Sequence, residues 1–212
     1  MNLTTLDARQ AGPKASPTLC ALELVDVPAG LCALDTLVKE AEVTVYFAGD
    51  IDPGRFLIVF GGDLAGSETA LARATLDAGR DVVESLLLPF AHARLRAALV
   101  GELSSEAATE GLSLGILQCH SPTSILAAVD RALKAAEVSV VRLRFASELA
   151  GQGHCVLCGD QHDVEAALSA AETGAPAGVV VRSRRIARPA PEVYAAAAQR
   201  EPCPRRLRPL EP

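Results

Sequence analysis

The sequence predicts an α/β protein of the α+β type, built from two tandem copies of one β-α-β-β-α-β domain. Residues 20–43 align with residues 115–138 without a gap, at an offset of 95 positions. Residues 60–63 then align with residues 157–160 at an offset of 97, so the second copy holds two additional residues in between. A repeat this long indicates a domain, because solenoid repeats span roughly 20–50 residues.

Each element of the first copy follows from its apolar pattern and its flanking residues. Pro28 is tolerated in the first turn of a helix, where its missing N–H costs no hydrogen bond, and Ser67 is the expected N-cap of the next helix. The segment 48–54 is rich in Gly, Asp and Pro, which predicts the turn of a hairpin. The strands are expected at 18–25, 43–47, 55–61 and 82–88, and the helices at 28–41, 67–78 and 92–98.

The second copy repeats this order of elements. Ser121 is the expected N-cap of a helix with Pro122 at its first position, and Asp163 is the expected N-cap of the following helix. Residues 146–153 form a longer counterpart of the first hairpin turn. The strands are expected at 114–117, 138–145, 154–158 and 178–181, and the helices at 122–136 and 163–171.

The predicted organisation is two domains with polar ends. Residues 1–16 are expected to form a flexible N-terminal arm, and residues 201–212, which contain several Pro and Arg, an irregular tail. The first domain is expected over residues 17–103 and the second over residues 110–200, with a linker at 101–111 where the two meet.

The composition argues against several classes of function. Hydrophobic residues make up 50% of the chain but aromatic residues only 3%, with no Trp, so platforms for base stacking or sugar binding are not expected. Residues 1–106 hold 8 Lys and Arg against 15 Asp and Glu, a net charge of −7, whereas residues 107–212 hold 12 against 11, a net charge of +1. Since the C-terminal Arg residues alternate with Pro and Glu, we predict no nucleic-acid partner. The sequence begins without an apolar secretory segment, and its apolar runs are far shorter than the roughly 20 residues of a membrane-spanning helix. We therefore predict a cytosolic bacterial protein with no membrane partner.

The chain shows no motif that carries catalysis. Cys155 and Cys158 form a CxxC pattern, but it lies in an expected strand, where residues three apart point to opposite faces. No second CxxC completes a zinc site, so we predict no metal site and no cofactor, and a thiol redox role remains an alternative. Gly-Gly-Asp at 61–63 and Gly-Asp at 159–160 lack the phosphate-loop patterns and predict tight strand-to-helix turns. We therefore predict that the protein is not an enzyme.

Three motifs in order resemble those of one family. The pattern DxxxKxAxV occurs at residues 35–43 and again at 130–138, PGRFLIVFGGD follows at 53–63, and a late strand ends in Arg-Pro at 188–189. Over about residues 18–198 the chain resembles the tandem-domain, trimeric shell proteins of bacterial microcompartments. Its element order is similar to the unpermuted branch of that family.

The resemblance implies two domains with antiparallel sheets and a structural function. Three chains of such a protein form a flat homotrimeric pseudohexamer, which tiles with hexamers and pentamer caps of other shell proteins around enzymes in the bacterial cytoplasm. The edge residues of the family correspond to Lys39, Lys134 and Arg188. The first copy has residues 90–94 in place of the Arg-containing edge, so its two kinds of edge are expected to tile differently.

The resemblance also implies a central pore lined by the hairpin loops of the two copies. The expected pore-lining residues are Asp50, Ile51, Asp52, Pro53, Gly54, Ser147, Glu148, Leu149 and Gly151. Asp50 and Asp52 are read either as a solvated acidic turn or, with Glu148, as rings of carboxylates that favour cations and repel anions. Some relatives hold an iron–sulfur cluster through a Cys just before this Pro-Gly. This chain has Asp52 there, and since such clusters require thiolates, no cluster is expected.

A different class of protein has a similar order of elements. A tandem regulatory module of the amino-acid-sensing type also consists of two such domains, binds effectors between them, and forms dimers or tetramers. The two hypotheses differ in the mass expected in solution.

Overall fold

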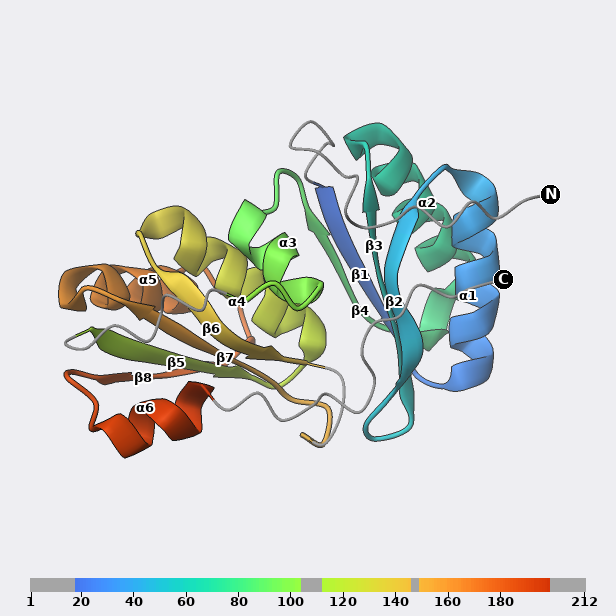
Figure 1. Cartoon of the computed structure of the whole chain (residues 1–212). Coiled ribbons are helices and arrows are strands. Elements are labelled where there is room, and N and C mark those ends of the chain that lie inside the picture. The colour runs from blue at the N-terminus through green and yellow to red at the C-terminus, as the bar shows by residue number, and fades with distance from the viewer. Residues whose placement is uncertain (1–17, 104–111, 146–148, 199–212) are drawn as a thin grey trace.

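The computed structural model describes residues 18–103, 112–145 and 149–198, and it contains the predicted β-α-β-β-α-β order twice (Figure 1). The expected arm, most of the linker, the tail, Ser147 and Glu148 lie outside these ranges. The elements of the first domain are β1 (Thr18–Leu24), α1 (Val27–Glu40), β2 (Thr44–Ile51), β3 (Arg55–Gly62), α2 (Leu64–Ala78), the 3-10 helix η2 (Gly79–Asp81), β4 (Val82–Leu88) and α3 (Ala93–Leu99). The elements of the second domain are β5 (Ser113–Cys119), α4 (Pro122–Ala135), β6 (Ser139–Arg144), β7 (Gly153–Gly159), α5 (Gln161–Thr173), β8 (Val181–Ile186) and α6 (Pro191–Ala198).

Each domain contains a four-stranded antiparallel sheet with the same topology. The strand orders are β2-β3-β1-β4 and β6-β7-β5-β8. Both domains even share an irregularity in register, because the pairing shifts between Val45 and Phe47 in β2 and between Val140 and Arg142 in β6. A bulge at equivalent positions in both copies confirms that the repeat in the sequence is a repeat of structure.

The first helix of each domain begins at a side-chain cap, of which Ser121 was predicted and Asp26 was not. The Asp26 side chain accepts a hydrogen bond from the backbone N–H of Ala29, and Ser121 Oγ accepts one from Ser124, in each case with Pro in the first turn. The predicted cap at Ser67 is wrong. Asp63 caps α2, and its carboxylate accepts from Gly66, so the helix begins a turn earlier and Ser67 is buried within it.

Three further expectations need correction. Asp160, rather than Asp163, is the N-cap residue of α5. β2 continues to Ile51, which shortens the predicted turn at 48–54 to three residues. The last strand of the second domain is Val181–Ile186 instead of 178–181, and the helix α6 was not expected. β8 is an edge strand whose Arg residues are exposed, so it lacks the apolar run from which a buried strand is recognised.

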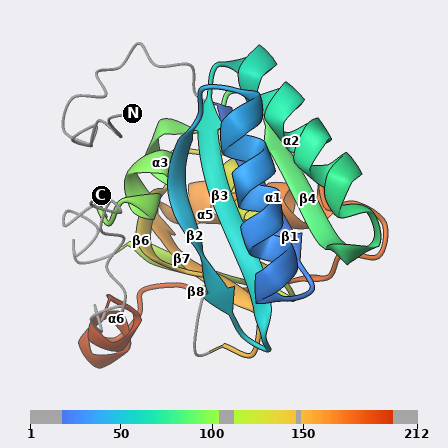
Figure 2. The ribbon, with the colours of Figure 1, turned by 90° about the vertical axis from the view of Figure 1, so that its right-hand side faces the viewer.

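The two faces of each sheet are covered differently, and we name them by their cover. Two long helices lie on the paired-helix face, α1 and α2 in the first domain (Figure 2). In the second domain these helices are α4 and α5. A short C-terminal helix lies on the single-helix face, α3 in the first domain and α6 in the second. No helix in the described ranges is both long and apolar enough to cross a bilayer.

The domains pack in series, with the helices of one against the sheet of the other (Figure 1). The single-helix face of the first sheet, with Leu19, Ala21, Leu57 and Val59, shares one hydrophobic core with α3 and with the helix α4 of the second domain. The paired-helix face of the first sheet has its own core under α1 and α2. Consequently α4 is covered by the other domain, whereas its counterpart α1 lies at the surface.

Candidate assembly surfaces and pore loops

The contact between the domains, which we call the domain junction, is formed by α4 against β1, β4 and α3. Glu84 on β4 accepts hydrogen bonds from Ser121 Oγ at 2.5 Å and from Ser124 Oγ at 3.0 Å. Asp130 on α4 accepts one at 2.8 Å from the backbone N–H of His92, which precedes α3. The junction thus combines an apolar contact with specific polar contacts at the N-terminal end of α4 and at Asp130 further along the helix.

Arg94 on α3 adds a further contact to the junction. It donates to the carbonyl oxygen of Val138 at 2.8 Å and pairs with the Glu137 carboxylate. In the other copy of the repeat, Glu192 corresponds to Arg94 and Glu42 to Glu137. Both residues are acidic, so they do not form an equivalent ion pair.

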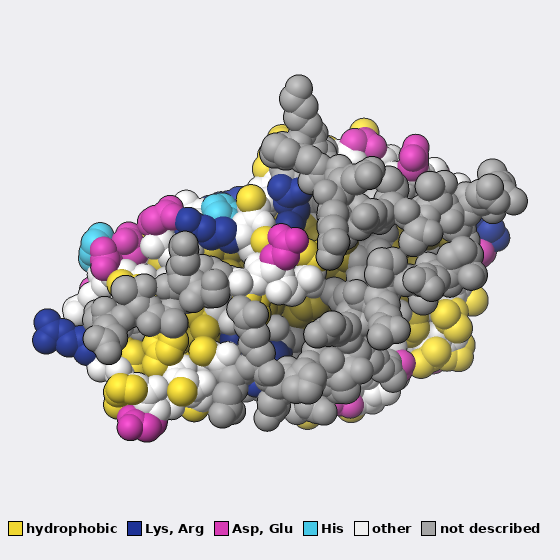
Figure 3. Space-filling view, viewed as in Figure 1, with side chains coloured by type: hydrophobic (Ala, Val, Ile, Leu, Met, Phe, Trp, Pro, Cys, Tyr) yellow, Lys and Arg dark blue, Asp and Glu magenta, His cyan; other side chains and the backbone are white. Residues whose placement is uncertain are grey.

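One stripe of α4 is buried in the junction, and the same stripe of α1 is exposed. Leu126 and Leu133 are 0% and 4% exposed, whereas their counterparts Leu31 and Val38 are 54% and 48% exposed. In Figure 3 hydrophobic side chains gather over the part of the molecule that α1 occupies, at the right. Because the helices have the same position in their own domains, the difference in burial comes from the neighbouring domain. Helix α1 therefore carries the same kind of surface as α4, and in the described part of a single chain no other domain covers it.

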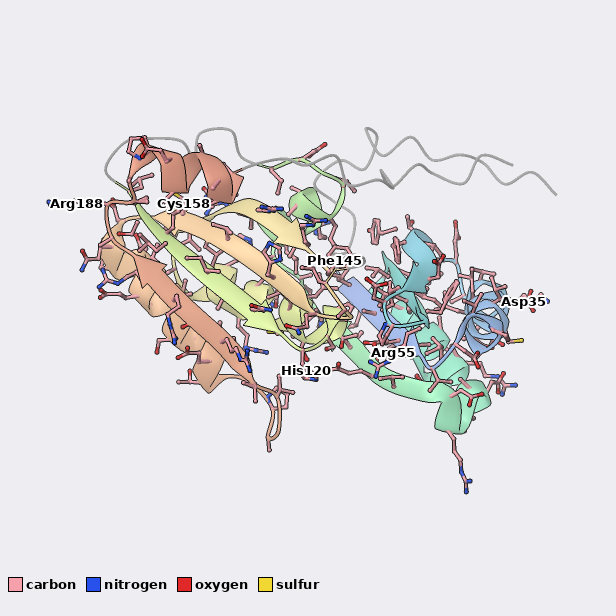
Figure 4. All side chains as sticks on the ribbon, turned by 90° about the horizontal axis from the view of Figure 1, so that it is seen from below. Asp35, Arg55, His120, Phe145, Cys158 and Arg188 are labelled. Atoms are coloured by element: carbon pink, nitrogen blue, oxygen red, sulfur yellow. The ribbon has the colours of Figure 1, made fainter. Side chains whose placement is uncertain are left out.

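The complementary half of this surface lies at the other end of the molecule. In the first domain, Glu84 and Leu86 on β4 contribute to the surface that receives α4. Their counterparts by strand register are Arg182 and Arg184 on β8, which with Ile116 and Gln118 line a shallow depression of about 480 Å³. Figure 4 shows Asp35 of α1 and Arg188, two residues beyond β8, at opposite ends of the molecule.

The two predicted edge lysines occupy equivalent positions in different surroundings. Lys39 pairs with Asp35 and Lys134 with Asp130, each at 2.6 Å and one helical turn apart. The Asp35 side chain is 61% exposed, whereas that of Asp130 is 3% exposed, because the junction covers it. Lys39 lies beside the exposed apolar stripe of α1, whereas Lys134 lies beside the equivalent stripe of α4, which is buried in the junction.

The predicted edge residue Arg188 is exposed, next to the strand end of β8. Its backbone φ is 47°, in the left-handed region. Phe90, at the same place after β4, has a φ of 57° and is 63% exposed. The backbone of the two copies is therefore alike at this point, and only the side chain differs.

The two expected pore loops lie against each other. Gly151 has a φ of 79°, and a Cβ atom placed there would come within 2.9 Å of the carbonyl oxygen of Asp52 and 3.2 Å of the Pro53 ring. The rings of Phe47 and Phe145, which precede the two loops in the sequence, also meet edge to face with their centroids 6.3 Å apart. The structure thus brings together two loops that are about 100 residues apart in the sequence.

The residues of the first loop differ in their exposure. Asp50, Pro53 and Gly54 are exposed and Asp52 is half-buried. Ile51 is 4% exposed and packs in the core between the domains, so its side chain does not line a pore. In the second loop Leu149 and Gly151 are half-buried.

An ion pair with a buried carboxylate joins β1 to the start of β3, directly after the first loop, and was not anticipated from the sequence. Arg55 Nη1 is 2.6 Å from Glu23 Oε1, and the Glu23 side chain is 0% exposed. Burial raises the pKa of Glu23, an effect that Arg55 opposes. The counterparts in the second domain are Gln118 and Gln152, which are hydrogen-bonded at 2.5 Å. Alignment of the two copies could have revealed that this pair changes jointly from charged to neutral.

The CxxC pattern is not a thiol site. Cys155 and Cys158 belong to different hydrophobic cores on opposite faces of the second sheet. Burial raises the pKa of the Cys155 thiol, which keeps it protonated. The redox alternative is therefore wrong for these two residues.

Among the described residues, Asp160, His162 and Asp163 form the one group whose ligand atoms lie within 4.8 Å of one another. They surround the N-terminus of α5, and Asp160 and His162 are exposed. Acidic residues are favoured at this end of a helix by the helix dipole, which accounts for the arrangement.

Asp52 occupies the position at which some relatives hold an iron–sulfur cluster through a Cys, and the cysteines of the described residues lie outside both loops. These residues do not fit such a cluster.

Comparison with known proteins decides the family. The model of the BMC domain matches residues 18–91 and again residues 113–189, so each match runs from the first strand of a domain past its last. The bacterial microcompartment shell protein PduT of Citrobacter freundii is 34% identical over 175 residues, which cover 82% of this chain and 94% of that protein. This chain belongs to the BMC domain family of bacterial microcompartment shell proteins.

Solved structures of this family have the same fold. A microcompartment protein from Desulfitobacterium hafniense DCB is similar with a TM-score of 0.72 and 24% identity, over 84% of this chain and 97% of that one. The fused permuted hexameric shell protein MSM0275 from the RMM microcompartment gives a TM-score of 0.57 and 22% identity, over 73% of this chain and 79% of that one. The alternative of a tandem regulatory module is not supported by these comparisons.

Proposed function

We propose that this BMC protein is a facet tile of a microcompartment shell in the bacterial cytoplasm, and that it assembles as a homotrimer in which six domains form a pseudohexameric ring. The observation that carries the proposal is the domain junction. Within one chain, α4 is buried against the first domain, while the same surface of α1 and the corresponding depression beside β8 are both uncovered.

A ring of six domains requires six junctions. Three chains supply three of them internally, and α1 of each chain placed on β8 of its neighbour supplies the other three. Such a head-to-tail contact uses two different surfaces and closes into a ring when its rotation allows. Exposed apolar side chains on α1, which cost free energy in a monomer, are then removed from water.

The proposed pore lies at the centre of this ring. Each chain contributes the two loops that meet at Gly151 and Pro53, so three chains bring six loops together. The loop of the first domain carries Asp50 and Asp52, and the pore of the trimer then favours neutral or cationic solutes over anions. Crystals of the trimer soaked separately in caesium and iodide should show caesium near the threefold axis, and iodide on the axis would contradict the proposal.

The proposed role is structural rather than catalytic. The tile edges would contact hexamers and pentamer caps of other shell proteins, with Lys39, Lys134 and Arg188 at these edges. The Lys134 side chain remains 43% exposed although the junction beside it is filled, which supports an edge contact separate from the junction, and Arg188 is exposed as well.

The decisive experiment is the mass of the protein in solution, measured by size-exclusion chromatography with light scattering. A trimer of about 66 kDa, three times 22.0 kDa, is expected. Leu31→Asp should shift the protein to a monomer, because it places a charge in the proposed contact between chains. Leu76→Asp is the matched control, since Leu76 is 72% exposed on α2 and its counterpart Thr173 is also exposed in the second domain. A wild-type protein that is a clean dimer or monomer refutes the proposal.

A further inference from the structure

The domain junction is polar at the N-terminal end of α4. Glu84 accepts hydrogen bonds there from the hydroxyl groups of Ser121 and Ser124. Ser121 is also the N-cap of α4. A carboxylate on the edge strand of one domain therefore contacts the first turn of the helix presented by the other.

The corresponding positions in a junction between chains carry charges. Arg182 lies opposite Gln118 in β5, just as Glu84 lies opposite Glu23 in β1, so Arg182 replaces Glu84. Asp26, the N-cap of α1, replaces Ser121. We infer that, in the trimer proposed above, Arg182 of one chain forms an ion pair with Asp26 of the next, and that this pair makes the contact between chains chemically different from the contact within a chain.

The charges around these two residues are complementary as well. The surface beside β8 carries the exposed Arg182 and Arg184, with Glu172 also lining its depression, and α1 and its ends carry the exposed Asp26, Asp35, Glu40 and Glu42. Part of this charge is neutralised within the chain, since Lys39 pairs with Asp35. The net charges of the two surfaces remain opposite, which favours their association, although Glu192 and Glu42, at the positions of Arg94 and Glu137, are both acidic.

The pair also explains how the two junctions remain distinct. If α1 of another chain displaced α4 from β4, Asp26 would lie against Glu84, and two carboxylates would face each other. Seated on β8 instead, Asp26 meets Arg182. Repulsion in the wrong arrangement and attraction in the right one together give specificity.

The experiment is a charge-reversal cycle, read out as the trimer association constant from sedimentation over a dilution series. Each exposed ion pair contributes up to about fivefold, so the loss of three pairs lowers the constant by up to about 100-fold, and the repulsion between two carboxylates in Arg182→Asp adds to this loss. Adding Asp26→Arg to Arg182→Asp should restore most of it. Arg184→Asp is the matched control, since Arg184 is also exposed on β8 and Asp26→Arg should not rescue it. Asp26→Asn separates the charge from the helix cap, because Asn caps a helix as well as Asp does.

A second measurement tests proximity without relying on stability. In a background with Cys32→Ser and Cys203→Ser, which removes an exposed thiol and the cysteine near the C-terminus, Asp26→Cys combined with Arg182→Cys should form covalent dimers and trimers on oxidation. Glu84→Cys combined with Ser121→Cys should cross-link within one chain and remain monomeric on a denaturing gel. These two patterns would confirm that the same junction occurs once within and once between chains.

The outcomes separate this inference from the proposed function. A wild-type chain that stays monomeric overturns both. A wild-type trimer whose Arg182→Asp variant associates with undiminished strength, or whose double variant shows no recovery, overturns the ion pair and leaves the trimer standing.

Discussion

Replacing Leu31 by alanine should weaken the trimer while leaving the single chain almost as stable as before. Leu31 is 54% exposed on α1, and its counterpart Leu126 is 0% exposed in the domain junction. The same substitution at these two positions therefore removes a contact between chains in one case and a contact within the chain in the other.

The expected magnitudes follow from the exposed fractions. Full burial of a leucine side chain contributes about 1.5–3 kcal/mol, so burying the exposed half of Leu31 in a neighbour contributes about 1 kcal/mol or slightly more. Three junctions then lose about 3–4 kcal/mol in total, which lowers the trimer association constant by roughly 100- to 1,000-fold. Leu126→Ala should instead lower the free energy of unfolding by about 2–5 kcal/mol, because it leaves a cavity in a filled core.

The assay combines sedimentation velocity over a dilution series with urea unfolding of both variants. We expect the midpoint of trimer dissociation to move to higher concentration for Leu31→Ala. Unfolding measured under conditions where the protein is monomeric should remain close to wild type for this variant and shift strongly for Leu126→Ala. If Leu31→Ala changes the dissociation midpoint by less than about threefold, with the wild type a trimer, the equivalence of the two junctions is refuted.

Three further predictions concern the loops and edges. Arg55→Ala should lower the free energy of unfolding by about 2 kcal/mol by leaving Glu23 buried without its partner, and the double variant Glu23→Gln with Arg55→Gln, which copies the second domain, should recover it in urea unfolding. Because the pKa of Glu23 is raised in the folded state, its contribution to stability is largest below the usual pKa of a glutamic acid and falls as the pH rises, so the loss in Arg55→Ala should be larger at pH 7 than at pH 4. Gly151→Ala should cost about 1–3 kcal/mol, since its φ of 79° disfavours any side chain and the facing loop leaves no space; an unchanged urea midpoint would contradict the loop contact. Lys39→Ala combined with Lys134→Ala should abolish extended sheets in electron micrographs while light scattering still shows the trimer, and unchanged sheets would exclude these lysines as edge contacts.

The elements that could be predicted from the sequence are those with strong local signals. Ser121 before Pro122 marks the start of α4, and the Gly-Asp sequences after β3 and β7 mark turns into helices, because capping and turn formation depend on residues a few positions apart. The repeat itself located both domains, and the DxxxKxAxV and PGRF motifs indicated the family that the comparisons confirmed.

The errors have two physical causes, one local and one long-range. Ser67 looks like a cap, yet Asp63 precedes the helix and takes that role. β8 was misplaced because its Arg side chains conceal an edge strand that is recognised by its pairing with β5. Ile51 was expected to line the pore with its loop, but the domain packing turns its side chain into the core. For β8 and Ile51 a partner distant in the sequence decided among options that the local residues left open, whereas for Ser67 a competing cap four residues earlier decided.

The sequence by itself determined that this protein has two homologous domains, the order of their strands and most helices, and the family to which they belong. Only the tertiary structure decided which copy of each surface is covered. Leucine occupies the same helical position at 31 and at 126, with the same periodicity around it, and yet one is exposed and the other buried. Periodicity shows that a helix has an apolar face, whereas burial depends on the domain that packs against that face, and this packing joins residues far apart in the chain.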